Sequence, residues 1–153
     1  MTAEYDDSSV QELAEQILKA IAATSKMASA DLEGNLSRKA NVDKGKLQGS
    51  WFRTMLGSFR WMIWSGAEYA EAVSEGWAPF TIYPNTAEVL AFKWQDAPAA
   101  VQQMFPDTFP VVFFKSIEHP GYEGSGYIDE AIEATSGRVD EFVEYNIEKV
   151  FMG

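Results

Sequence analysis

Apolar residues recur at helical spacing near both ends of the chain. Near the N-terminus they lie three or four residues apart, at Val10, Leu13, Ile17 and Ile21. This spacing gives one apolar stripe, which predicts a helix over about residues 9–30 and requires a partner surface. From Tyr127 onward the same spacing predicts a second helix over about residues 127–151, bent or interrupted at Gly137. The polar residues after Gly34 predict a connection.

Between these helices the pattern changes to short runs that are rich in β-branched and aromatic residues. The runs 50–56 and 59–64 flank Gly57-Ser58, a two-residue connection of the kind that closes a β-hairpin. Apolar and polar residues alternate only imperfectly in these runs. We therefore expect both faces of the hairpin to be covered, one by a helix and the other by another subunit.

The rest of the central region predicts three further strands and a short helix. The strands are expected at 81–84, 89–94 and 111–117, and the helix at 67–75, ended by Gly76. The long segment 95–110 is predicted to be a loop, which is typical of a functional or partner-contacting segment.

The order of these elements predicts one α+β domain over residues 1–153. A mainly antiparallel sheet with a hairpin, spanning with its short helix about residues 47–118, is expected to pack against the N-terminal and C-terminal helices. A chain of 153 residues has room for a single full-sized core.

Charge and composition reduce the number of function classes that fit the chain. The chain has 23 acidic and 12 basic residues, so its net charge is −11, and it contains no cysteine. Lys and Arg supply most of the affinity for duplex DNA, so a phosphate-binding surface is not expected. The absence of cysteine excludes disulfides and thiolate chemistry and suits a reducing cytoplasm. No window is apolar enough for a membrane span, and the acidic N-terminus is unlike a signal peptide.

Half of the basic residues lie close together in the sequence. They are Arg38, Lys39, Lys44, Lys46, Arg53 and Arg60. This stretch is interpreted as a solvated loop or as a docking surface for an acidic partner.

Candidate catalytic and metal-binding residues are sparse. His119 is the sole histidine, and it precedes a turn at Pro120-Gly121, so we interpret it as a structural loop residue. The glycines at 121, 124 and 126 have neither the dinucleotide nor the P-loop spacing. The acidic clusters near the C-terminus indicate a solvated helix face. No enzyme activity, cofactor or metal site is therefore expected.

The aromatic residues are more informative. Tryptophans within strand runs are typical of a core or a subunit interface, and aromatic residues beside turns favour an interface. The residues predicted to contact another subunit are Trp51, Trp61, Trp77, Phe80, Tyr83, Met104 and Phe105.

Several short motifs occur in an order that resembles the neck or tail-completion proteins of tailed bacteriophages. Val42-Asp43-Lys44-Gly45-Lys46-Leu47, followed by Ser50-Trp51, is similar to that family's V-D-T-G-x-L…S-W segment, with Lys44 in place of Thr. Tyr69-Ala70 through Gly76-Trp77 resembles its Y-A-x-x-V-E-x-G-T segment, with Ser74 in place of Glu and Trp77 in place of Thr. Pro84, then His119-Pro120-Gly121, resembles its I-x-P and H-P-G strands.

The resemblance implies an α+β structural protein of the virion neck or upper tail, assembled in the host cytoplasm and without enzymatic activity. Its expected partners are other copies of itself in a ring, with six-fold symmetry, and adjacent neck, portal-complex or tail-tube proteins. DNA would pass through the ring without sequence-specific binding. Acidic residues are then expected to line the channel and prevent phosphate contacts. These are Asp129, Glu130, Glu133, Asp140 and Glu141.

Other classes of function remain open at this point. The first alternative is an acidic soluble binding protein, such as a DNA-mimic inhibitor of a host enzyme. A carbohydrate-binding tail module comes next and an enzyme last. The motifs also leave open whether the ring serves tail completion, tail termination or head closure.

Overall fold

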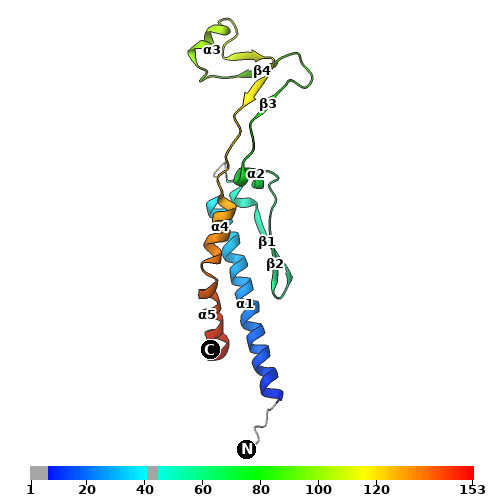
Figure 1. Ribbon diagram of the computed structural model, residues 1–153, viewed down its shortest axis with the longest axis vertical. Coiled ribbons are helices and arrows are strands. Elements are labelled where there is room, and N and C mark those ends of the chain that lie inside the picture. The colour runs from blue at the N-terminus through cyan, green and yellow to red at the C-terminus, as the bar shows by residue number, and fades with distance from the viewer. Residues whose placement is uncertain (1–6, 41–44) are drawn as a thin grey trace, which may run out of the picture. The chain divides into compact units, whose positions relative to one another are not determined.

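The computed structural model describes residues 7–40 and 45–153, and it confirms the α+β class. A long N-terminal helix, antiparallel strand pairs and two C-terminal helices follow one another along the chain (Figure 1). The sequence predicts one domain, whereas the contacts divide the chain into two compact units. Unit 1 comprises Met1–Glu75 and Gly124–Gly153, and unit 2 comprises Gly76–Glu123.

In unit 1 the first helix, α1, spans Asp7–Lys39. The predicted connection after Gly34 is wrong, because the helix continues through this glycine. Leu36 is only 3% exposed and belongs to the main core, and Asn35 donates to the hydroxyl of Thr135 at 3.0 Å. Burial of one Leu side chain stabilises by about 2 kcal/mol, more than the roughly 1 kcal/mol that a helical glycine costs.

The predicted hairpin is confirmed. A 3₁₀ turn at Gln48–Ser50 (η1) leads into β1, Trp51–Gly57, which pairs antiparallel with β2, Arg60–Ser65. Gly57 pairs with Arg60, so the two-residue turn is Ser58-Phe59, one position later than predicted. An irregularity in the register between Met55 and Gly57 brings this glycine into the ladder.

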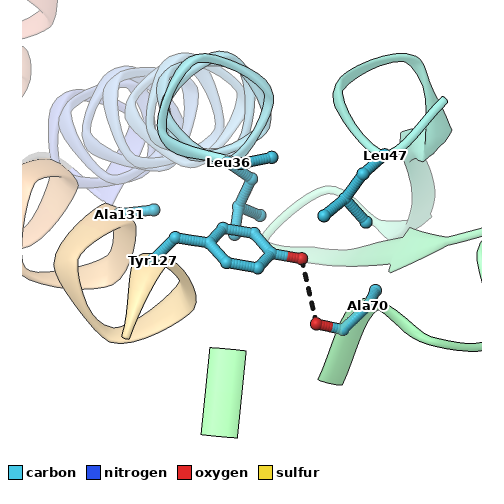
Figure 2. Packing of buried hydrophobic residues seen from close by; sticks show 6 residues of the cluster. Leu36, Leu47, Ala70, Tyr127 and Ala131 are labelled. Atoms are coloured by element: carbon cyan, nitrogen blue, oxygen red, sulfur yellow. Dashed lines mark hydrogen bonds between the residues drawn. The ribbon is translucent and has the colours of Figure 1, made fainter. Parts of the chain in front are cut away.

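Three helices complete unit 1: α2 (Ala70–Glu75), α4 (Tyr127–Ser136) and α5 (Val139–Met152). The predicted C-terminal helix is thus interrupted at Gly137, as expected. Figure 2 shows how Tyr127 ties α4 to the rest of the unit. Its ring lies among Leu36, Leu47 and Ala131, and its hydroxyl donates to the carbonyl oxygen of Ala70 at 3.1 Å.

A polar seam joins α1 to the two C-terminal helices. Asp31 accepts hydrogen bonds from Asn35 at 3.0 Å and from Thr135 at 2.9 Å, and it pairs with Arg138. Further along, the amide of Asn146 donates to Thr24 at 3.2 Å. These polar groups satisfy one another, so the helices pack closely without a wide apolar stripe.

Unit 2 consists of two strand pairs and a helical turn. β3 (Phe80–Ile82) pairs antiparallel with β6 (Ile117–His119), and β4 (Leu90–Lys93) pairs with β5 (Val111–Phe114). The run 111–117, predicted as one strand, therefore divides into β5 and β6, because its halves pair with different partners. The predicted loop 95–110 contains a helix, α3, at Ala99–Met104.

Candidate subunit interface

The hairpin of unit 1 has one face against α1 and one face exposed. Residues alternate along β2 between exposed and partly buried, and the register carries the same alternation onto the first half of β1. This two-residue period follows from strand geometry. The sequence predicted one face covered by a helix and the other by another subunit, and the helix-covered face is confirmed.

The inner face is held to α1 by Arg53. Its guanidinium pairs with Glu33 at 3.0 Å, donates to the hydroxyl of Ser29 at 3.1 Å, and lies 5.1 Å from the ring centroid of Trp61. Trp51 meets the ring of Tyr127 edge-on, with centroids 6.2 Å apart. Trp51 and Trp61, which the sequence predicts at a subunit interface, thus lie on the face that their own chain covers.

The outer face carries large apolar side chains that the sequence reasoning did not select. We define the hairpin outer face as Phe52, Thr54, Met62 and Trp64. Phe52 is 46% exposed, Trp64 is 41% exposed, and their ring centroids are 5.0 Å apart. The indole nitrogen of Trp64 donates to the hydroxyl of Thr54 at 3.0 Å. The alternation of side chains along the two paired strands identifies these residues once Arg53 is placed on the inner face.

A second uncovered apolar surface lies between α1 and α5. It is a groove of about 160 Å³, which we call the α1–α5 groove. Its lining residues are Ile17, Ala20, Ile21, Thr24, Val143, Ile147 and Phe151. Its polar lining atom, the hydroxyl of Thr24, donates to the carbonyl oxygen of Ala20 at 2.8 Å. Ile17 and Ile21, two residues of the N-terminal apolar stripe predicted to need a partner, lie in one wall of this groove.

In unit 2, four of the predicted interface residues are exposed and one is packed. Trp77, Phe80, Tyr83 and Met104 are all exposed. Phe105 is instead partly buried and contacts the rings of Phe113 and Phe114, with ring centroids 6.1 and 5.6 Å away.

Two of the family-motif positions, Val42 and Asp43, lie outside the described residues. The turn residues Gly45 and Gly76 have positive φ angles of 74° and 81°. Leu47 and Ala70 are buried in the core of unit 1. The motif residues Tyr69 and Pro120 are exposed, and Pro84 is partly buried.

The sequence predicted His119 to be a structural loop residue, and the structure places it at the end of β6, beside the turn that follows. Its Nδ1 accepts a hydrogen bond from the backbone N–H of Gly121 at 3.0 Å, and its ring stacks on Phe80 with centroids 5.0 Å apart. Gly121 has φ +81°, and a Cβ there would lie 2.7 Å from the backbone nitrogen of Pro79 and the carbonyl oxygen of Trp77. Only glycine fits this turn without displacement.

The five predicted channel-lining acids are exposed on the C-terminal helices. Asp129 and Glu130 occupy the first turn of α4, and Asp140 and Glu141 the first turn of α5. Carboxylates at these positions stabilise the positive end of a helix dipole, which gives these four acids a local role as well. Glu133 lies beyond the first turn. Within residues 7–40 and 45–153, no three His, Cys, Asp or Glu residues are grouped to hold a metal ion.

Burial raises the pKa of Tyr127 above its ordinary value of 10.0. Its hydroxyl therefore stays protonated and keeps its bond to Ala70 throughout the physiological range. This hydrogen bond joins α4 to α2.

Comparison with known proteins finds no relative of the chain. No protein-family model matches the chain, and no curated protein or solved structure gives a significant match. Among the helices of the described part of the chain, none is both long and apolar enough to cross a membrane.

Proposed function

We propose that the chain is a structural subunit of the neck or upper tail of a tailed bacteriophage. In this role, copies form a ring around the DNA channel and help to join or complete head and tail. The observation that carries the proposal is that unit 1 exposes two separate apolar surfaces, the hairpin outer face and the α1–α5 groove. Exposed apolar surface of this kind is typical of a protein that assembles with others.

The motif resemblance supplies the phage context of the proposal. The acids on α4 and α5 are proposed to face the channel, where like charge prevents DNA phosphates from binding. The basic stretch from Arg38 to Arg60 would contact a neighbouring ring or subunit. Portal-complex, neck and tail-tube proteins are the proposed neighbours.

The test is immunogold electron microscopy of purified virus particles from an infection that produces the chain. Antibody against the chain is applied to particles and to the cleared lysate of the same infection, with pre-immune serum as the matched control. Gold at the head–tail junction is the expected result. Label confined to the cleared lysate would overturn the proposal and favour the acidic inhibitor.

A further inference from the structure

We propose that the hairpin outer face of one copy docks into the α1–α5 groove of a second copy. The contact rests on the proposed function only for its closure into a ring. Three features of unit 1 support it: the matching size and chemistry of the two surfaces, the charges beside them, and their positions around α1.

The two surfaces match in chemistry and size. An apolar cavity of about 150 Å³ accommodates a benzene ring, so a groove of about 160 Å³ can receive the ring of Phe52 or part of Trp64. Both surfaces already satisfy their polar groups internally, at Thr54 and at Thr24. Covering them therefore removes apolar area from water and leaves these donors paired.

The charges on the hairpin and on the α5 side of the groove are opposite. Residues 45–67 carry three basic side chains, Lys46, Arg53 and Arg60, and no acidic one. Arg53 is paired with Glu33, while Lys46 and Arg60 are exposed. On the other side, Val139–Met152 carries four acids and one lysine.

Two of these acids adjoin the groove. Glu144 and Glu148 each follow a groove-lining residue and precede the next lining residue by three positions, so each lies beside the groove on the helix surface. Opposite charges at the edges of two apolar surfaces steer them together and fix their orientation. The α5 side of the groove would repel an acidic partner, whereas a second copy of this chain brings a basic hairpin.

The hairpin of a given copy does not reach the groove of that same copy. Its polar contacts on α1 are with Lys26, Ser29 and Glu33, whereas the polar contacts of α5 on α1 include Thr24 and Met27. Residues two positions apart lie about 200° apart around a helix. Figure 1 accordingly shows the hairpin and α5 on either side of α1.

The contact is therefore between unlike surfaces of two copies. Because the acceptor copy keeps its own hairpin free, the contact can repeat from copy to copy. Such contacts close into rings when the rotation between copies permits it.

The test uses cysteine pairs in the 153-residue chain, which has no cysteine of its own. A Met62→Cys chain is mixed with an Ile147→Cys chain under mild oxidation. A docked pair holds the two thiols at high effective concentration, so the disulfide-linked heterodimer should exceed that of a control pair roughly tenfold. The control replaces Met62→Cys with Gln103→Cys, an exposed position in unit 2. A heterodimer yield equal to that of the control pair overturns the proposal.

A second measurement examines the contribution of Trp64 to self-association. Trp64→Ala should weaken self-association roughly thirty-fold in sedimentation, as removal of a central interface tryptophan does. Trp94→Ala, at a 38% exposed tryptophan of unit 2, should leave self-association unchanged. Equal effects of the two variants, with unchanged circular dichroism, would overturn the assignment of Trp64.

The two proposals fail in different ways. A heterodimer without gold on particles would retain this contact and remove the neck role. Gold at the junction without a heterodimer would retain the neck role and remove this contact.

Discussion

Replacing Tyr127 with phenylalanine should lower the free energy of unfolding of unit 1 by the contribution of one buried hydrogen bond. The ring is 1% exposed, and its hydroxyl donates to the Ala70 carbonyl at 3.1 Å. The variant keeps the ring packing and loses one buried hydrogen bond, whose net contribution is about 1 kcal/mol. For a chain of this size, this corresponds to a decrease in melting temperature of about 3 °C. Tyr127→Ala also removes the ring and should cost about 3–5 kcal/mol.

Urea unfolding followed by far-ultraviolet circular dichroism measures this loss. The method reports mainly on unit 1, because α3 is the one helix of unit 2 among the described residues. The matched control is Tyr145→Phe, since Tyr145 lies on α5 and is 52% exposed. The reasoning is refuted if Tyr127→Phe is as stable as the parent chain, or if Tyr145→Phe loses as much.

Three further outcomes are expected. Because the pKa of Tyr127 is raised in the folded state, its contribution to the free energy of unfolding is full below pH 10, the unfolded value, and is lost as the pH rises through the folded pKa. In urea titrations at increasing pH, the free energy of unfolding of Tyr127→Phe should therefore fall less than that of the parent chain. Gly121→Ala should destabilise unit 2 by at least about 2 kcal/mol, through its positive φ and its contacts at 2.7 Å, as measured by amide exchange. Gly57→Ala, with open space around it, should not destabilise its own unit, unit 1, by a comparable amount. Glu133→Lys should slow DNA ejection from particles without changing helix stability, because Glu133 lies outside the first turn of α4; an unchanged ejection rate would argue against the channel position.

Local sequence patterns predicted the elements that local rules control. The hairpin follows from two β-forming runs around a short turn, and the break between α4 and α5 follows from Gly137. The end of α1 and the split of 111–117 depend instead on partners far away in the sequence. Leu36 packs on Tyr127, and β5 and β6 pair with different strands. No window of neighbouring residues contains that information.

The candidate interface was predicted by residue type and only partly by position. The sequence indicated a hairpin with two apolar faces, but it did not show which face α1 would cover. That choice is made by Arg53, whose partner Glu33 lies 20 residues earlier in the chain. Because side chains alternate along a strand, placing one residue inward fixes the others up to the register irregularity between Met55 and Gly57. Trp51 and Trp61 turn inward for this reason, and Phe52 and Trp64 turn outward.

The net charge of −11 and the exposed apolar surfaces have opposite effects on self-association. Like charge over most of the chain keeps copies apart, which limits unspecific contact through the apolar residues. The hairpin does not share this negative charge, because residues 45–67 have no acidic side chain. Two copies therefore attract each other most when the hairpin of one meets the groove of the other, beside which Glu144 and Glu148 lie. Charge then selects the orientation, and the burial of Phe52 and Trp64 supplies the strength of the contact.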